Sequence, residues 1–488
     1  MTARRREHGH LPIIEHAPVE IGADEVREIA NMAARIRQRN PAIGAGETYG
    51  RAVRVGLAPG GSLFLHDTAG IQSAGRAEAS GLEYRPLALA GDGDCLAISV
   101  ARVPAFERYC RDFLGLGSVE VIRTAASERR ASLATLCRRD PAVLARLAEI
   151  ARARGGMTVQ PYVSSGAVWR LAAAIARRAG VPVGVAAPPP ALAHYVNDKL
   201  WFARRVVELL GPAAVPRGYE ARDLAALARH AAELARESDQ LVIKLPRAAG
   251  SLGNALLDGS RLRTLSHAAL EREIAGFLSG LGWRRPFPLL IAIWESPVAL
   301  SPSVQLWIPL SGEGLPLVEG IFDQIVSGAV GRFIGAVPSG LPARVRRRIA
   351  YEAVRLCTLF QQLGYFGRCS LDAILVGRDV EHAALRWVEC NGRWGGTSTP
   401  MTLVNRLTGD WVDSPFVALQ PDWRLRLGFE EVLDRTRDVL FRPGSRSGVA
   451  FASPGDLAAG TGIAYVGIGE DIDAGRRQAR HATELLRG

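Results

Sequence analysis

The sequence predicts an α/β protein of several domains, and three observations lead to this fold class. First, apolar strand-like runs alternate with amphipathic helical stretches between about residues 51 and 190, as expected of a parallel sheet with helices on its faces. Second, 488 residues are enough for roughly two to four domains with cores of their own. Third, hydrophobic residues make up 48% and charged residues 22%, which is ordinary for a globular protein.

The elements of the first part follow from these periodicities. We expect an early helix at residues 25–37, strands at 52–57, 95–100, 119–122 and 157–161, and helices at 104–113, 132–153 and 167–179. The arginine-rich N-terminus has no apolar stretch after it, so it is interpreted as a frayed tail and not as a signal peptide. The run Pro188-Pro189-Pro190 is interpreted as a linker.

A second block opens at Tyr195. Asn197 or Asp198 can cap a helix that begins near Lys199, and Gly211 ends it. Further along we expect a helix near 221–236, strands at 241–244, 289–295 and 303–310, a helix at 343–363, and strands at 367–375 and 385–391. After about residue 421 a helix at 429–439, strands at 448–452 and 462–467 and a helix at 474–486 indicate a small α/β unit without a catalytic cluster.

Charge and cysteine content exclude several classes of protein. The net charge of +11 is compatible with nucleic-acid binding, but the arginines are scattered and no zinc-finger or RRM signature occurs. A positively lined cleft for nucleotide phosphates and an acidic substrate explains the charge equally well. The six cysteines show neither CxxC nor metal-ligand spacing and indicate core residues of a protein in the reducing cytoplasm. No apolar run reaches membrane-spanning length.

Lysine is almost absent from this chain. Of its 60 basic residues, 58 are arginine, and the lysines are Lys199 and Lys244. A chain that uses arginine wherever a plain positive charge suffices is expected to keep lysine where a compact ammonium is needed instead of a planar guanidinium. Chance survival and solvent exposure are the plainer explanation.

Both lysines stand in settings suited to phosphate. Lys199 is expected at a helix start, close to partially positive backbone amides. Lys244 ends a strand, and the glycine- and serine-containing loop 249–254 follows it. Such loops present backbone N–H groups to phosphates, although this is not a P-loop because the lysine precedes the loop. An ordinary hairpin turn is the alternative.

Oxygen ligands gather near residue 390. Glu389 and Asn391 share one face of a strand, and Arg393 follows at its end. Carboxylate and amide oxygens suit Mg²⁺, and an arginine beside them suits a phosphate oxygen. Asp372 lies on the preceding strand, where it can face Glu389 across a hairpin; two carboxylates that close repel unless a cation lies between them. A solvated edge strand that ends in a turn is the alternative.

The order of these features resembles the ATP-grasp superfamily. The resemblance covers roughly residues 195–421 and depends on Lys199, Lys244 with its glycine-rich loop, Asp372, and the Glu389-x-Asn391-x-Arg393-x-Gly-Gly motif. A flanking α/β domain on each side, together with the segments 157–162 and 301–306, resembles the pheganomycin-type peptide ligases. The resemblance implies a Rossmann-like pre-ATP-grasp domain at 1–193, a two-subdomain ATP-grasp domain at 194–425 with its hinge near 294–298, and a small α/β C-terminal domain at 426–488.

The resemblance also implies a role for each residue that matches the family pattern. Lys199 and Lys244 would contact the nucleotide phosphates, and loop 249–254 would be the mobile lid over them. Asp372, Glu389 and Asn391 would hold Mg²⁺. In the lid, the residues implied for nucleotide binding are Ala249, Gly250, Ser251 and Gly253. At the hinge they are Trp294, Glu295 and Val298. The residues implied for catalysis are Arg393 and Arg368. Residues 299–303 lack the acidic ribose ligand that the family often has, so ribose recognition is left open, with Glu295 as a substitute.

These roles imply an enzyme that consumes ATP with Mg²⁺ as cofactor. The expected activity is carboxylate–amine ligation through an acylphosphate, forming an amide or peptide bond in specialised metabolism, with ADP and phosphate released. Expected partners are small-molecule or peptide carboxylates and amines in the cytoplasm; a membrane is not expected, nucleic acid is disfavoured, and a homodimer is compatible with the sequence. Two alternatives stay open: an ATP-grasp kinase that phosphorylates an alcohol, and a non-catalytic nucleotide- or nucleic-acid-binding protein.

Overall fold

The computed structural model describes residues 4–8, 11–67, 82–124, 131–248, 253–283, 287–456 and 460–488. Its first large element is a parallel sheet in the order β3-β8-β7-β4-β5-β6. The strands are β3 (Val53–Val55), β4 (Ser62–Leu65), β5 (Cys95–Ile98), β6 (Glu120–Arg123), β7 (Met157–Pro161) and β8 (Val183–Val185). The alternation in the sequence thus correctly predicted a parallel α/β unit, although it missed β4 and β8.

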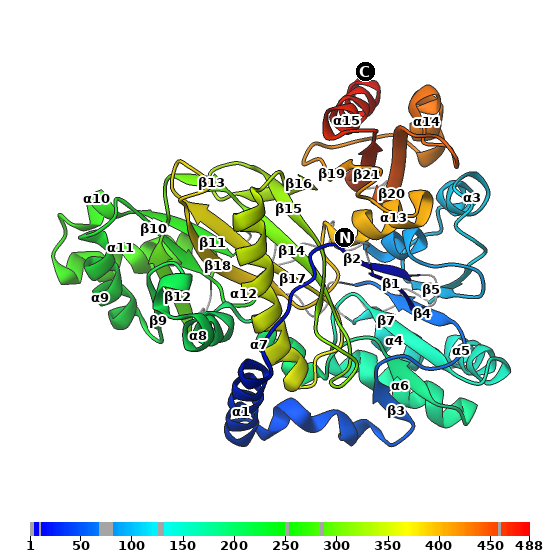
Figure 1. Cartoon of the computed structure of the whole chain (residues 1–488), viewed down its shortest axis with the longest axis horizontal. Coiled ribbons are helices and arrows are strands. Elements are labelled where there is room, and N and C mark those ends of the chain that lie inside the picture. Colours follow the sequence, from blue (N-terminus) through cyan, green and yellow to red (C-terminus); the bar gives the residue numbers. More distant parts are fainter. Residues whose placement is uncertain are drawn as a thin grey trace.

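Helices cover this parallel sheet on both faces (Figure 1). They are α3 (Pro104–Arg108), continued by a π-helical turn Tyr109–Phe113, then α4 (Leu133–Arg139), α5 (Pro141–Ala153) and α6 (Gly166–Ala179), with a 3₁₀ turn η2 (Arg85–Ala88) before β5. The helix expected at 132–153 is two helices, because Pro141 starts α5 and the Asp140 carboxylate caps it by accepting from Ala142 and Val143 N–H. Two consecutive helices, α4 and α5, therefore lie where one long helix was expected.

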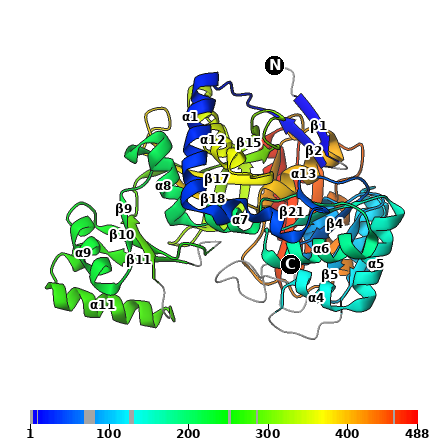
Figure 2. The same ribbon diagram turned by 90° about the horizontal axis from the view of Figure 1, so that it is seen from below.

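A smaller antiparallel sheet in the order β11-β10-β12-β9 follows. Its strands are β9 (Gly218–Ala221), β10 (Gln240–Lys244), β11 (Asn254–Asp258) and β12 (Leu289–Ile293), and its helices are α9 (Leu224–Ala235), α10 (Gly259–Leu262) and α11 (His267–Gly280). In two views at right angles this unit projects from the rest of the molecule (Figures 1 and 2). It has a hydrophobic cluster of its own, from Ala221 to Ile291.

The largest sheet runs β13-β17-β14-β15-β16-β19-β21-β20, with β18 paired to β17. Its strands are β13 (Val298–Leu300), β14 (Pro302–Ile308), β15 (Leu317–Ser327), β16 (Arg332–Pro338), β17 (Gly367–Val376), β18 (Ala384–Asn391), β19 (Phe416–Leu419), β20 (Gly448–Asp456) and β21 (Thr461–Ile468). Helices α1 (Ala23–Arg39) and α12 (Ala343–Gln362) contact each other beside it. Strands β15 and β16 were missed by the sequence interpretation.

The chain after residue 426 adds to this sheet instead of forming one of its own. It contains α14 (Phe429–Arg435), β20, β21 and α15 (Ile472–Arg487), and β21 pairs with β19. A small α/β unit was expected here, and its strands and last helix are present. Pairing through β19 joins them to the strands that carry Asp372 and Glu389.

One local interpretation was wrong, and another needs a structural detail added. The N-terminal tail is not frayed in the described residues, because β1 (Arg4–His8) pairs with β2 (Leu11–Glu15) and the side chains of β2 are buried. The proline run connects β8 to α7 (Pro190–Val196) as a buried segment: residues 187–189 are buried, and Pro188 O accepts from Ser164 Oγ. Both segments are held by packing that a local pattern does not contain.

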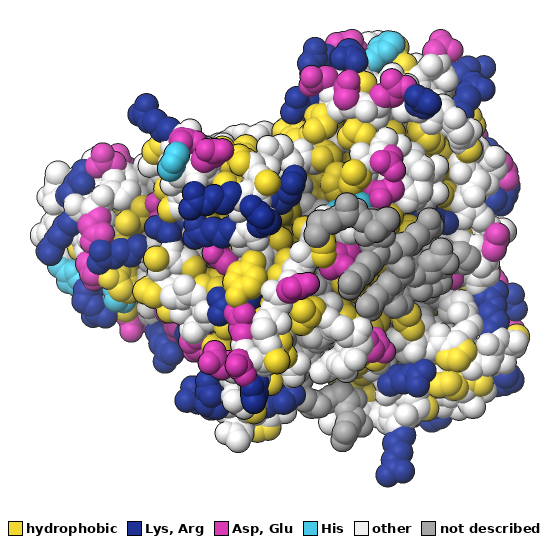
Figure 3. Space-filling view, viewed as in Figure 1, with side chains coloured by type: hydrophobic (Ala, Val, Ile, Leu, Met, Phe, Trp, Pro, Cys, Tyr) yellow, Lys and Arg dark blue, Asp and Glu magenta, His cyan; other side chains and the backbone are white. Residues whose placement is uncertain are grey.

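Other expectations agree with the structure. All six cysteines are buried and unpaired by disulfides. Basic and acidic side chains are interspersed over the face shown in Figure 3. Across the described ranges, no helix combines the length and the apolar character that a membrane span requires.

Candidate active site on strands β14, β17 and β18

The candidate site is one face of three neighbouring strands. Antiparallel pairing places Ser303 of β14 opposite Asp372 of β17, and Asp372 opposite Glu389 of β18. Directly opposite residues share a face of the sheet. The predicted meeting of Asp372 and Glu389 across a hairpin is therefore confirmed by the register. We call Ser303, Asp372 and Glu389 the carboxylate row.

Hydrogen bonds hold Asp372 from two sides. Ser303 Oγ donates to Asp372 Oδ1 at 2.6 Å, and Asn391 Nδ2 donates to Asp372 Oδ2 at 2.9 Å. Burial and the charge of Glu389 nevertheless raise the pKa of the Asp372 carboxyl to about 7. A carboxylate held at such a cost is a group that a cation would stabilise.

Glu389 differs because a lysine neutralises it. Lys199 Nζ lies 2.8 Å from Glu389 Oε2 and donates to Ala248 O at 2.6 Å, and the Lys199 side chain is only 8% exposed. Burial alone would raise the pKa of Glu389, but the Lys199 ammonium lowers it to about 2. The two carboxyls of the row thus have opposite pKa shifts, which is common at functional sites.

Lys199 reaches Glu389 because of how its helix starts. Asp198 caps α8 (Lys199–Leu210) by accepting from Leu200 and Trp201 N–H, and Gly211 ends the helix, as predicted. Lys199 N–H donates to Pro246 O at 2.9 Å, which fastens this helix start to the segment after β10.

Lys244 completes the basic side of the site. It is half-buried at the end of β10, and burial, followed by the charge of Lys199, lowers the pKa of the Lys244 ammonium to about 8. The structure therefore brings both lysines of the chain to the same carboxylate.

Arg393 lies beside the carboxylate row and is anchored by Asn197. Its NH1 donates to Asn197 Oδ1 at 2.6 Å, and Gly392 N–H donates to the same oxygen at 3.0 Å. The charge of Arg393 acts on the pKa of both Asp372 and Glu389. Asn197 was considered only as a helix cap, so its actual role was missed.

The donor set fits a hard divalent cation after one adjustment. Two carboxylates and an amide are suitable ligands. Because this set has only two carboxylates, it is not one of the clusters of three His, Cys, Asp or Glu that could hold a metal, and the described residues contain no such cluster. At present the nitrogen of Asn391, not its oxygen, faces Asp372 and Glu389. Holding a cation requires this amide to turn over.

Some predicted residues lie elsewhere or outside the described ranges. Ala249, Gly250 and Ser251 fall outside the described residues. Gly253 packs tightly, because a Cβ there would come within 2.2 Å of Ala248 Cβ. At the predicted hinge, Trp294 N–H donates to Gln240 O at 3.0 Å, while Glu295 is half-buried and Val298 exposed.

Arg368 shares the sheet face with Asp372 but is enclosed. It forms an ion pair with Glu319, lies over the rings of Trp307 and Trp394, and donates to Thr402 Oγ1 at 3.3 Å. Burial lowers the pKa of the Arg368 guanidinium to about 9. Glu319 was not anticipated, because nothing around it in the sequence marks it as a partner of an arginine.

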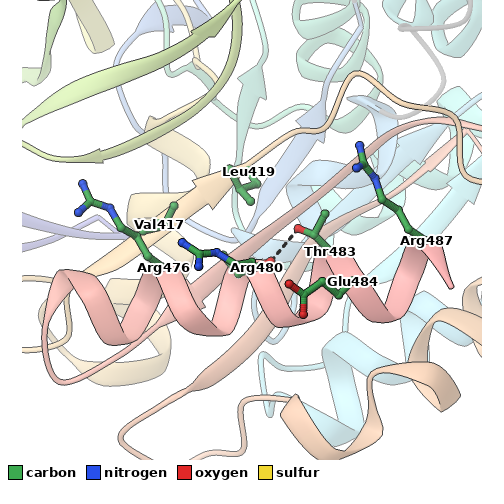
Figure 4. Close-up of a pocket in the computed structure, with 8 residues that line it drawn as sticks. Val417, Leu419, Arg476, Arg480, Thr483, Glu484 and Arg487 are labelled. Atoms are coloured by element: carbon green, nitrogen blue, oxygen red, sulfur yellow. Dashed lines mark hydrogen bonds between the residues drawn. The ribbon is translucent and has the colours of Figure 1, made fainter.

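A hollow of about 410 Å³ lies away from these strands. It runs along α15 beside β19, with Arg476, Arg480 and Arg487 on the helix and Val417 and Leu419 on the strand (Figure 4). None of its lining residues was predicted to be functional, and the carboxylate row is not part of it.

Comparison with known proteins identifies the fold. Residues 83–177 match the family model of the pre-ATP-grasp domain, and residues 434–482 match the PGM1 C-terminal domain. N5-carboxyaminoimidazole ribonucleotide synthetase, solved with ADP, superposes with a TM-score of 0.54 at 13% identity, covering 89% of this chain and 100% of that one. The chain has the ATP-grasp fold.

Further similar structures also have nucleotides bound. Biotin carboxylase from Campylobacter jejuni, in a complex with β,γ-ATP, has a TM-score of 0.54 at 12% identity, covering 88% of this chain and 92% of that one. The biotin carboxylase domain of 2-oxoglutarate carboxylase from Hydrogenobacter thermophilus, with MgADP, ADP and bicarbonate, has a TM-score of 0.51 at 12% identity, covering 88% of this chain and 90% of that one. No curated protein matches the sequence.

A second polar feature lies at the carboxyl end of strand β4 in the parallel sheet. From β4 the chain continues to β5 on one side of that strand, and it returns later to place β7 on the other side. Such a reversal of strand order is a switch point, and ligands bind there in open α/β sheets. His66 follows β4 and contacts the rings of Tyr162 and Trp394. Its side chain is fully buried, and neither ring nitrogen has a hydrogen-bond partner among the described residues.

His66 should make the protein sensitive to acid. Burial, followed by the charge of Arg85, lowers the pKa of its imidazole from 6.5 to about 3. The folded state then binds fewer protons than the unfolded state, so stability is complete above pH 6.5 and is lost as pH falls toward 3. Between pH 8 and pH 5 this group should cost about 2 kcal/mol of unfolding free energy.

Denaturant titrations of wild type and His66→Phe at both pH values measure this effect. The variant cannot titrate, so its loss of stability on acidification should be smaller by that amount. An equal loss in both proteins would mean that His66 is not buried as a neutral base.

Proposed function

We propose that the protein is an ADP-forming, ATP-dependent carboxylate–amine ligase, and more specifically a peptide ligase of the pheganomycin type. The observation that carries this proposal is the convergence of Lys199, Lys244 and Arg393 on the paired carboxylates of Asp372 and Glu389. Such a site neutralises and positions phosphates, which is what phosphoryl transfer requires of a protein.

Each residue has a role in this proposal. Asp372, Glu389 and Asn391 would hold Mg²⁺, which supplies charge neutralisation for the phosphates. Lys199 would exchange part of its contact with Glu389 for phosphate oxygens, and Lys244 would bind phosphate oxygens beside it. Arg393, held by Asn197, would stabilise the transferring phosphoryl group while the substrate carboxylate attacks it.

The distance to the predicted hinge supports nucleotide binding. β13 begins at Val298, opposite Val376, which is four residues along β17 from Asp372. At about 3.3 Å per residue the separation is about 13 Å, which suits a nucleotide with its base at 294–298 and its phosphates at the carboxylate row. The similar structures that contain ADP, ATP or MgADP support the same choice of ligands.

The order of parts supports the peptide-ligase proposal. The pre-ATP-grasp match precedes the carboxylate row, and the PGM1 C-terminal match follows it. This is the arrangement that the resemblance implied, with domains at 1–193, 194–425 and 426–488. Substrates would be an amino-acid or peptide carboxylate and an amine, and the product an amide.

The direct test is product mass spectrometry with ATP, Mg²⁺ and mixtures of amino acids and short peptides, beside an assay of ADP release. We expect ADP release that requires both a carboxylate and an amine, and a product joined by loss of water. Release with alcohols alone would show a kinase. No turnover, together with salt-sensitive DNA binding, would show a binding protein.

Lys244→Arg should damage the enzyme although it preserves charge. A guanidinium is larger and planar, and the half-buried end of β10 holds a compact ammonium. We expect kcat/KM for ATP to fall at least about tenfold, a loss of about 1.4 kcal/mol in transition-state stabilisation. Arg480→Lys, at an exposed position of α15, is the matched control and should be silent. Wild-type kinetics for Lys244→Arg would refute the importance of the ammonium.

A further inference from the structure

The face of β14, β17 and β18 continues beyond the carboxylate row. One residue pair along, Gln305 of β14 lies opposite Ser370 of β17, and Ser370 lies opposite Asn391 of β18. The Gly395–Gly396 turn passes over this second row, since a Cβ at Gly395 would lie 3.7 Å from Ser370 Oγ. Gln305 is only 1% exposed.

The hydrogen bonds fix which way the Gln305 amide points. Asp372 accepts at both of its oxygens, from Ser303 Oγ and from Asn391 Nδ2, so the Ser303 hydrogen is committed to Asp372. Ser303 Oγ can then only accept from its other neighbour, and Gln305 Nε2 donates to it at 2.9 Å. Turning the Gln305 amide over would set two acceptors against each other.

The side-chain oxygen of Gln305 is consequently without a hydrogen-bond donor among the described residues. Oε1 is buried and has no hydrogen-bond partner among the described residues. A buried carbonyl without a donor is costly, and such an exception calls for an explanation. It is an acceptor, so whatever completes it must bring an N–H or O–H group.

Among the reactants of a ligation, only one brings hydrogen on its reacting atom. The transferring phosphate and the substrate carboxylate offer acceptors and would be repelled by Oε1, whereas the attacking amine offers N–H. We propose, building on the proposed function, that Gln305 Oε1 accepts a hydrogen bond from the amine substrate. Gln305 thereby presents the nitrogen lone pair to the acylphosphate formed beside the carboxylate row.

The chemistry balances with no further reactant. The amine nitrogen attacks the acyl carbon, a C–N bond forms, the C–O bond to phosphate breaks, and phosphate leaves with that electron pair. The amine gives up one proton as the amide forms, and the departing phosphate takes it. Gln305 takes no proton; it orients the N–H that remains.

The test separates the two half-reactions in Gln305→Met, which keeps the unbranched shape and removes the acceptor. Substrates are the carboxylate and amine found in the product screen, with hydroxylamine as a second nucleophile. We expect kcat/KM for the amine to fall about tenfold to a hundredfold. Carboxylate-dependent positional isotope exchange in ¹⁸O-labelled ATP, which needs no amine, should stay within about twofold of wild type.

Gln361→Met is the matched control, because Gln361 is also buried but donates to Pro309 O and Gly314 O, remote from the carboxylate row. It should leave amine kinetics unchanged. If Gln305→Met does not fold, Gln305→Asn withdraws the acceptor by one methylene and should show the same split.

Unchanged amine kinetics would overturn the inference by showing that water satisfies Oε1. An equal fall in isotope exchange and amine capture would also overturn it, since Gln305 would then act through Ser303 and Asp372. A product screen that yields no ATP-dependent amide would refute the ligase function itself, and the inference with it.

Discussion

Asp372→Asn should abolish turnover and at the same time stabilise the protein without its ligands. Loss of one well-placed charge at the phosphates typically costs about 3–4 kcal/mol, or roughly 10²–10³ in rate. The carboxylate faces Glu389 across the hairpin, and burial and that charge raise its pKa to about 7. Removing it should add about 1–2 kcal/mol to the unfolding free energy, a figure reduced because the group is only half-buried.

ADP release and denaturant titration without Mg²⁺ measure the two effects. Asp379→Asn is the matched control, because Asp379 is exposed between β17 and β18 and pairs with His382; its turnover should stay within about twofold of wild type. Normal turnover of Asp372→Asn would refute a role for this carboxylate at the phosphates.

Glu389→Gln should have the opposite effect on stability. It removes the partner of the buried Lys199 ammonium, 2.8 Å away, and an uncompensated buried charge destabilises. The two substitutions should therefore change the unfolding free energy in opposite directions. A gain in stability from both would contradict the ion pair between Lys199 and Glu389.

Arg368→Met should destabilise the fold by about 3–5 kcal/mol, because it leaves the carboxylate of Glu319 buried without a cation. Glu319 is fully buried, and Arg368 is enclosed by Trp307 and Trp394. Adding Glu319→Gln should recover at least half of that loss, since it removes the uncompensated charge. Denaturant titrations of the two single variants and the double variant give the coupling energy.

Turnover in the double variant decides what Arg368 does. The resemblance implied help with phosphoryl transfer, but the guanidinium already pairs with Glu319 and donates to Thr402. We therefore expect ADP release to recover to within about tenfold once stability is restored. A stable double variant without turnover would assign Arg368 to the chemistry after all. Arg348→Met is the control, because its ion pair with Glu352 is largely exposed on its arginine side and should contribute under about 1 kcal/mol.

Local chemistry made part of the site predictable. The alternation along 385–391 put Glu389 and Asn391 on one face, and a short hairpin made Asp372 their neighbour, which the register confirms. The cap at Asp198 and the glycine at 211 fixed the limits of α8, and hence the place of Lys199. Periods of two and of 3.6 residues are local properties, so they can be read without knowing the fold.

Long-range pairing decided the rest. Ser303 and Gln305 could be assigned to the site only because β14 lies beside β17. Ser303 and Asp372 are 69 residues apart in the sequence. Glu319 stands at a register shift next to Gly320, where no periodic pattern marks it. Strands β4, β15 and β16 were missed, because each is stabilised by neighbours distant in sequence.

The sequence by itself determined the residue types at the phosphate site and the strand that carries them, because spacing of two and the scarcity of lysine are properties of the chain. Only the tertiary structure decided which charges neutralise one another: Lys199 with Glu389, Arg368 with Glu319, and Asn197 with Arg393. Partners 190, 49 and 196 residues apart meet through packing of whole elements. Electrostatic energy depends on distance and burial in space, which no one-dimensional pattern contains.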